Sequence, residues 1–208
     1  MPVTRGYLTR DWATRNPRIK ERLVDLSQWL VGEIDDIAAR LRTQVLELVP
    51  PSRRRERPGG GSPILWNTFH AARHASLALA VLSPEPGPER AAWLDALVSK
   101  AGPGIGVEEA ASSWADELSP EQVDRYLDDV LAATRRLLAG PAIDLDAVPD
   151  TGGALIRAGV APGEFGWLHR MWQGKPAAWL VRWPLLGHIG SHAGEMIATR
   201  NRMGLSPF

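Results

Sequence analysis

Three histidines in two separate segments have the residue type and spacing of a metal site. His188 and His192 stand four residues apart, and on a helix that spacing turns both imidazoles to one face about one turn apart. His70 belongs to a distant segment whose pattern is also helical. If the two helices pack side by side, three neutral nitrogen donors can meet at one point. Such a set binds a divalent transition metal and leaves coordination positions open for chemistry.

Each histidine also has a plainer interpretation as a hydrogen-bonded residue of the core. The pair His188 and His192 favours the metal, because two imidazoles on one face of an apolar helix are costly to bury unless they are bonded. His74 is the alternative third ligand if the helix that carries His70 is rotated by one turn. His169 is expected near the rim of the pocket or exposed to solvent.

The chemistry of a three-histidine site follows from the charge that it leaves on the metal. Neutral ligands leave the full double charge, so that water bound to zinc can reach a pKa of about 7, against about 15.7 in bulk. A thiol, whose pKa starts at about 8.5, should become a thiolate on coordination. The chain has no cysteine, so any sulfur nucleophile would come from a separate molecule. Zinc, nickel, cobalt and ferrous iron all fit three histidines.

Glu195 is the first candidate for a supporting role at this site. It follows His192 by three residues, so on a helix it lies near the same face. It could hydrogen-bond a ligand histidine or act as a base. The alternative is a surface carboxylate paired with Arg200 or Arg202.

Asn67 and Arg73 are the other candidates, since each lies three residues from His70. Either side chain could orient a ligand or bind a substrate carboxylate, and the arginine offers the stronger fork. Either could equally point away from the site.

The elements that must position these residues are helices. Apolar residues recur at steps of three and four in several long segments, and no segment has a convincing strand alternation. Pro184 lies inside the last apolar pattern and predicts a kink or a new helix start. Caps are expected at Asn16, Ser62 and Ser119, and Gly204 is a good C-terminal stop. The predicted long helices cover residues 17–48, 62–82, 119–138 and 176–203.

The connections between these helices have weaker signals. The loop 52–61 carries four arginines, which we interpret as a solvated connector rather than an anion site. Residues 89–118 predict one or two short helices, interrupted by a glycine run at 101–106 that lacks the ending of a phosphate loop. Residues 141–175 are expected to be irregular, with one short helix near 151–158.

Tryptophan is unusually abundant, with nine residues against three phenylalanines and two tyrosines. Trp167, Trp172, Trp179 and Trp183 fall close together, just before the histidine pair. Core packing is the favoured interpretation, because tryptophan buries a large area. The functional alternative is an aromatic wall around a substrate pocket close to the histidines.

Composition limits the class of protein. The 208 residues suit a single all-α domain over 1–208, and 44% hydrophobic with 23% charged residues is ordinary for a globular chain. The formal net charge is zero, so no global field favours nucleic acid or an acidic membrane. Without cysteine, disulfides, zinc-thiolate sites and a cysteine nucleophile are excluded. No signal-peptide pattern and no spanning apolar stretch are present, and we expect a cytoplasmic protein.

Two motifs together resemble the DinB-like superfamily, also called the YfiT-like metalloenzymes. They are His70-Ala71-Ala72-Arg73 and the run His188-Ile189-Gly190-Ser191-His192-Ala193-Gly194-Glu195, which is followed by a terminal Met203-Gly204. The tract 174–184 is similar to actinobacterial members. The resemblance implies a DinB-like four-helix bundle with extra short helices and long loops, and a metal site for zinc or nickel at His70, His188 and His192. It also implies homodimers and low-molecular-weight thiol cosubstrates such as mycothiol.

The sequence therefore predicts a divalent-metal-dependent enzyme that activates such a thiol for S-transfer or isomerisation of a small-molecule substrate. One alternative is a non-catalytic ligand-binding or stress-response protein in which the metal is structural. Another is a metal-dependent hydrolase that uses water.

Overall fold

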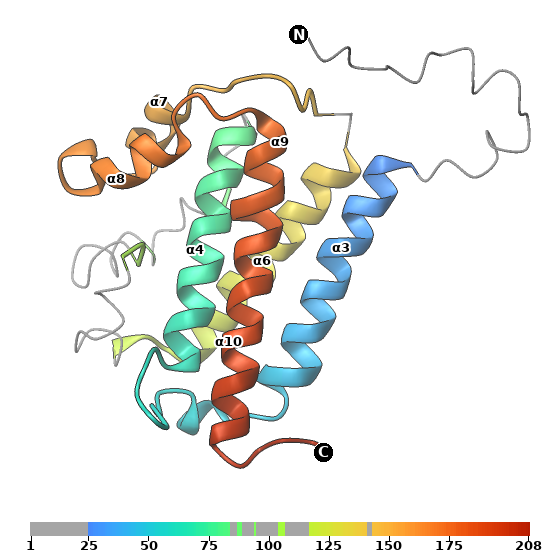
Figure 1. Cartoon of the computed structure of the whole chain (residues 1–208), viewed down its shortest axis with the longest axis vertical. Helices are drawn as coiled ribbons and strands as arrows, with labels where there is room; N and C mark the ends of the chain where they lie inside the picture. Colours follow the sequence, from blue (N-terminus) through green and yellow to red (C-terminus); the bar gives the residue numbers. More distant parts are fainter. Residues whose placement is uncertain (1–24, 84–86, 89–93, 95–103, 107–116, 141–142) are drawn as a thin grey trace, which may run out of the picture.

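The computed structural model describes residues 25–83, 87–88, 94, 104–106, 117–140 and 143–208, and within these ranges it contains helices and no strand. The long helices run roughly along the longest axis of the molecule (Figure 1). They are α3 (Leu26–Leu41), α4 (Ile64–Leu82), α6 (Pro120–Ala139) and α10 (His188–Arg202). The expectation of an all-α chain is confirmed for the described residues. None of their helices is both long and apolar enough to cross a bilayer.

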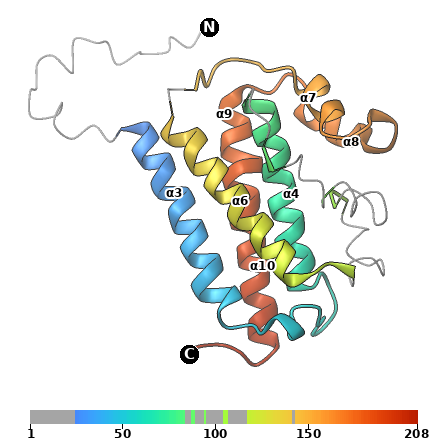
Figure 2. The same cartoon turned by 180° about the vertical axis from the view of Figure 1, so that it is seen from behind.

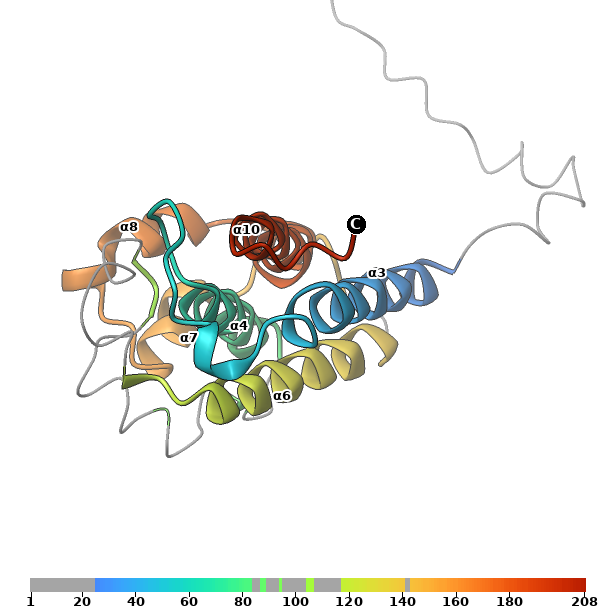
Figure 3. The same ribbon diagram turned by 90° about the horizontal axis from the view of Figure 1, so that it is seen from below.

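Helix α4 is the centre of the packing. Every residue from Ile64 to Leu79 is buried, because α4 contacts α6, α10 and the short helix α7 (Thr151–Arg157). Seen from below, α4 lies among the other helices, with α7 and α8 (Pro162–Trp172) on the side away from α3 (Figure 3). The polar side chains of α4 are therefore enclosed, and each must find a partner inside the protein or remain unbonded.

The first predicted helix is described only from its second part. Helix α3 begins at Leu26, where the Asp25 carboxylate accepts a hydrogen bond from the Ser27 backbone at 2.8 Å. Residues 17–24 and the expected cap Asn16 lie outside the described residues. After Leu41 the chain widens into one π-helical turn, η1 (Arg42–Leu46). Figure 2 shows α3 beside α6, against which it packs.

The helix starts at α4 and α6 differ in how well they were predicted. Ser119 caps α6 by accepting from the Gln122 backbone, and Gly140 ends that helix, as expected. The expected cap of α4 is wrong: Pro63, not Ser62, is the cap residue, and no side chain caps this helix. The backbone of Pro63 is extended, with ψ 157°, so the helix begins at Ile64. This is one residue later than expected for a proline at the first helical position.

The region 141–175 is more regular than predicted. Helix α7 matches the short helix expected near 151–158. Helix α8 contradicts the expectation of irregular structure, and it packs against α7. Gly163 and Gly166 lower helix propensity and obscured it, although Pro162 stands at its first position as a start signal.

The last helical run is continuous and absorbs its proline without ending. Helix α9 (Ala177–Leu180) leads into the π-helix η6 (Val181–Gly187), which contains Pro184 and continues into α10. A π-helical turn inside an α-helical run is a known way to accommodate a residue that disrupts the regular hydrogen-bond ladder. At the far end, the Leu205 and Gly204 amides donate to the Arg200 and Asn201 carbonyls. With φ +75° at Gly204, these bonds form a Schellman motif, and the prediction that Gly204 ends the helix is confirmed.

The arginine-rich loop after η1 holds the helices together. Arg54 is buried, and its guanidinium donates to both carboxylate oxygens of Asp124 on α6 and to two backbone carbonyls. Arg53 pairs with Glu56 inside the loop. The expectation of a solvated loop is therefore wrong for Arg54, which is buried and joins the connection to α6.

Candidate metal centre

Three imidazoles from two helices converge at one point. His70 comes from α4, and His188 and His192 come from α10, which packs against α4. One ring nitrogen from each of the three lies within 4.8 Å of the other two. The Nε2 atoms of His188 and His192 are 3.2 Å apart, as expected for residues one helical turn apart on one face.

Hydrogen bonds at the outer nitrogens turn two of these rings inward. His70 Nδ1 donates to the Gly104 carbonyl at 2.9 Å. His192 Nδ1 donates to a carboxylate oxygen of Glu195 at 2.9 Å. In each ring the proton then sits on Nδ1, so the lone pair on Nε2 faces the cluster. This is the usual arrangement around histidines that bind a metal.

Two of the three imidazoles, those of His70 and His188, are held in their neutral form. Burial, and then the repulsion of a charged His192, lower the pKa of His70 to about 4, although the Gly104 carbonyl raises it in part. Burial, followed by repulsion from His192 and His70, lowers the pKa of His188 to about 3. Both rings therefore carry free lone pairs at neutral pH. A metal needs this protonation state from its ligands.

The donor set fits a tetrahedral divalent ion. A zinc ion bound at about 2.05 Å would hold two nitrogens about 3.3 Å apart, close to the 3.2 Å between His188 and His192. His188 Nδ1 is buried and has no hydrogen-bond partner among the described residues. The cluster thus contains a buried polar atom that the described protein leaves unsatisfied. The ligand type fits zinc and nickel equally.

A fourth imidazole, His74, stands beside the cluster. Its ring centroid lies 4.6 Å from that of His70 and 4.4 Å from that of His188. Its Nε2 faces the Ile105 carbonyl at 3.3 Å, and burial, then the neighbouring imidazoles, lower its pKa well below the usual value. The converging group comprises His70 and not His74, so the described geometry does not favour the alternative in which His74 is the third ligand.

Two positioning features were not predicted from the sequence. The glycine run that we interpreted as an interruption supplies the Gly104 and Ile105 carbonyls that bond the histidines of α4. Gly104 has φ +69°, and a Cβ there would overlap the Phe69 ring. Trp66 stacks on His70 with centroids 4.3 Å apart and 16° between the planes. Histidines in so apolar a helix imply buried acceptors, which is the one signal that could have led to this loop.

The other candidate residues are placed as follows. Glu195 bonds His192, whereas Arg200 and Arg202 bond other groups. The Arg73 guanidinium donates to the Ala158 carbonyl at 3.2 Å, after α7. Asn67 is buried, and its side-chain oxygen has no hydrogen-bond partner among the described residues.

His169 lies apart from the cluster. It is partly buried, and its Nε2 bonds the Val160 carbonyl at 2.9 Å. It is not among the residues that line the cavity beside the cluster.

A cavity of about 380 Å³ opens beside the cluster. Its imidazole wall consists of His70, His74 and His188. The opposite walls are aromatic and apolar, formed by Trp167, Trp172 and Trp183 with Met171, Pro184, Ile105 and Gly106. Trp179 is not part of this lining and packs against the core, with the Lys175 ammonium 5.6 Å from its ring centre. Three of the four clustered tryptophans thus face the cavity.

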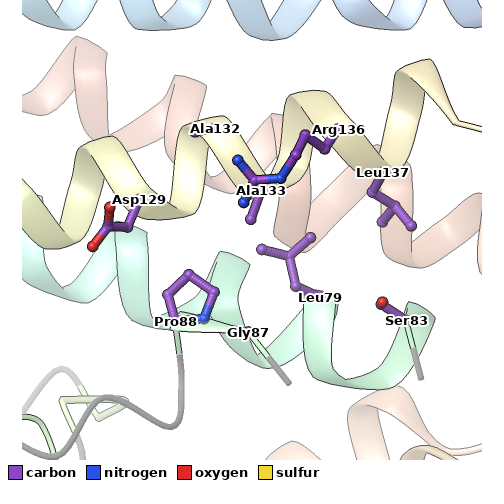
Figure 4. Close-up of a pocket in the computed structure, with 9 residues that line it drawn as sticks. All are labelled: Leu79, Ser83, Gly87, Pro88, Asp129, Ala132, Ala133, Arg136 and Leu137. Carbon is purple, nitrogen blue, oxygen red and sulfur yellow. The ribbon is translucent and has the colours of Figure 1, made fainter. Parts of the chain in front are cut away.

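Two other hollows contain no imidazole. One, of about 470 Å³, lies between the end of α4 and α6, with Asp129 and Arg136 on its α6 side (Figure 4). The other, of about 700 Å³, runs between α3 and the η6–α10 helix and includes Trp29. Of these three spaces, the cavity of about 380 Å³ is the one lined by histidines.

Comparison with known proteins found no matching family model, no matching curated protein and no matching solved structure.

Proposed function

We propose that this chain is a divalent-metal-dependent enzyme that activates a low-molecular-weight thiol, of the mycothiol type, for S-transfer or isomerisation. Its ligands are His70, His188 and His192, and its fold is a DinB-like four-helix bundle formed by α3, α4, α6 and the α9–α10 run. One observation carries the proposal: three ring nitrogens converge within 4.8 Å beside a cavity that two of the three rings line. The proposed metal is zinc or nickel.

The proposed metal site leaves a coordination position open, as catalysis requires. No fourth histidine or carboxylate joins the converging group among the described residues, and Glu195 bonds the outer nitrogen of His192 instead. Three protein ligands leave a tetrahedral ion at least one position for water or substrate. The cavity gives a small molecule access from the side of His70 and His188.

The bound ion would supply the Lewis acidity that lowers the pKa of a thiol. In the S-transfer, the sulfur electron pair forms the bond to an electrophilic carbon. The bond from that carbon to its leaving group breaks, and the leaving group departs with the electron pair, while the proton that the thiol lost is released to the solvent. The role of Glu195 in this proposal is to hold the Nδ1 proton of His192, which keeps the Nε2 lone pair directed at the cluster.

Metal binding is the first test. Calorimetric titration of metal-free protein with zinc should give one ion per chain. His70→Ala, His188→Ala and His192→Ala should each weaken binding by roughly a hundredfold or more. His169→Ala is the matched control, since this histidine lies outside the converging group and bonds the Val160 carbonyl. The proposal fails if the wild-type chain binds no zinc or if the control weakens binding as much as the three ligand variants.

The thiol reaction is the second test. Zinc-loaded protein should consume mycothiol in the presence of an aryl halide, and a chelator should stop the reaction. If the chelator lowers the melting temperature but no thiol is consumed, the metal is structural. If an ester is cleaved without any thiol, the site works as a hydrolase. Either outcome would replace the proposal of thiol transfer.

A further inference from the structure

The two walls of the cavity beside the histidine cluster differ in chemistry. On one side are the imidazoles of His70, His74 and His188, and on the other are indole rings. Among the described residues, no side chain of Asp, Glu, Lys or Arg lines it. A volume of about 380 Å³ lies within the roughly 300–1,000 Å³ range of small-molecule sites.

Large apolar side chains are unusually exposed around this opening. Trp167 is 38% exposed, Met171 40% and Trp183 42%, and all three line the cavity. Two of them lie on α8 and one on η6. Exposed apolar side chains gathered at a concave site are typical of ligand binding, because a ligand would remove them from water.

The backbone holds Trp183 against the cluster. It belongs to the π-helix η6, and such irregular turns are frequent at functional sites. The Trp183 ring meets His188 edge to face, with centroids 5.8 Å apart. A Cβ at Gly187 would lie 3.2 Å from this ring and 2.9 Å from the Arg182 carbonyl. The absence of a side chain at Gly187 therefore lets the indole pack beside the histidine.

We propose that this cavity binds an uncharged aromatic group, placed between the indoles of Trp167 and Trp183 and directed at the histidine cluster. This proposal rests on the proposed function and deepens it. It assigns the electrophilic substrate of that reaction to the class of neutral aryl compounds. Flat rings gain from stacking or edge contacts with indoles in addition to the area they bury. In the metal-free chain, a carboxylate in the same place would be buried without a metal ion, or a lysine or arginine of the described lining, to pair with it, which is costly.

The test uses two naphthalenes of similar size and the metal-free full chain. Binding of 2-methoxynaphthalene and of 2-naphthoate is measured by calorimetry at pH 7. The neutral compound should bind at least roughly tenfold more tightly. Equal affinity, or preference for the anion, would overturn the proposal.

Single substitutions then locate the site. Trp183→Ala and Trp167→Ala should each weaken binding of the neutral compound by roughly three- to tenfold, as expected from the loss of an aromatic contact. Trp29→Ala is the control, because Trp29 is 52% exposed and lines the separate groove along α3. If Trp29→Ala weakens binding as much as the other two, the aromatic compound binds elsewhere and the proposal is wrong.

A charge placed at the mouth gives an independent readout. Met171→Lys puts an ammonium at an exposed position of the lining and should tighten binding of 2-naphthoate while weakening that of the neutral compound. A gain of affinity cannot result from misfolding, so this variant keeps the test decisive even if a tryptophan variant is unstable. No change in the preference between the two compounds would contradict the proposal.

The two proposals can fail separately. If zinc binds but the neutral naphthalene does not, the metal centre stands and the substrate class is wrong. If the naphthalene binds as described but zinc does not, the aromatic site stands and the metal-dependent reaction is wrong. Both measurements are made on the same preparation, with circular dichroism as the check of folding.

Discussion

Acid should destabilise the metal-free protein through its buried histidines. His70 has its pKa lowered from 6.5 to about 4, chiefly by burial. The unfolded chain takes up a proton as the pH falls through about 6.5, whereas the folded chain does so only near 4. The contribution of His70 is therefore fully present above pH 6.5 and is lost as the pH falls to about 4. At about 1.4 kcal/mol per pH unit, the loss amounts to about 3 kcal/mol.

His188 acts in the same direction over a wider window, since its pKa is lowered to about 3. The two contributions do not add, because a proton on one ring raises the cost of a proton on the other. The value for His70 alone is thus a lower estimate for the cluster. Stabilities of folded proteins are about 5–15 kcal/mol, so a loss of this size is large enough to measure.

The assay is urea unfolding at pH 7, 6, 5 and 4 with a chelator present. The wild-type chain is compared with His70→Gln, which removes this titration while keeping a side chain that can donate to Gly104. Carboxylates titrate in both chains and cancel in the difference. The free energy of unfolding should fall by about 3 kcal/mol more in the wild-type chain between pH 7 and pH 4. Parallel pH profiles for the two chains would refute the reasoning.

Three further predictions concern the residues that hold the site and the helices. Asp124→Asn should lower the free energy of unfolding by about 2 kcal/mol in urea titration, because its partner Arg54 is only 5% exposed. Asp128→Asn on the same helix should lower it by less than about 1 kcal/mol, since both members of its pair with Arg42 are more than half exposed. Equal losses in the two variants would contradict the burial argument. Gly104→Ala should destabilise the folded protein by at least about 1 kcal/mol more than Gly60→Ala in thermal unfolding. Both glycines have positive φ, but of the two only Gly104 faces the Phe69 ring. An equal loss of stability in the two variants would mean that Gly104 is not packed against Phe69. Glu195→Gln should weaken zinc binding by roughly tenfold in calorimetric titration. The neutral amide oxygen can still accept from His192 Nδ1, but it is a weaker acceptor than the carboxylate. Glu33→Gln on α3 is the control, and unchanged affinity in Glu195→Gln would remove the proposed positioning role.

The sequence predicts elements best where local chemistry decides them. Helix α6 has an apolar stripe, a serine cap, a proline at its first position and a glycine at its end, and each of these signals acts within a few residues. The Gly204 stop is local in the same sense. These features were therefore accessible without knowledge of the fold.

Elements that depend on tertiary contacts were missed or placed less well. Helix α8 contains two glycines and a residue, Phe165, with non-helical angles, yet it forms because Phe165 and Leu168 are buried. The π-helical turns at η1 and η6 change the hydrogen-bond register. No propensity scale distinguishes that change from ordinary helix, because the surrounding packing selects it.

The same distinction between local signals and tertiary contacts applies to the candidate metal site. The spacing of His188 and His192 follows from helix geometry, so their common face could be predicted. The approach of His70 required that α4 and α10 pack in one particular register, which the sequence left open between His70 and His74. The acceptor of His70 lies 34 residues away, and nothing in the sequence pairs a histidine with a carbonyl at that distance.

The burial of so many imidazoles in one place is itself an argument about function. A core gains stability from apolar side chains. Here, by contrast, burial lowers the pKa of His70, His74 and His188 below the ordinary value of a histidine. The His188 Nδ1 atom and the Asn67 side-chain oxygen have no hydrogen-bond partner among the described residues. Apolar side chains of similar volume would not carry this cost of burying polar atoms. This excess of costly groups is intelligible if a ligand bound to the converging nitrogens offsets it, because a ligand that binds only the folded chain stabilises it. The same reasoning requires that zinc raise the stability of the wild-type chain far more than that of His70→Gln, which links the acid experiment to the proposed metal.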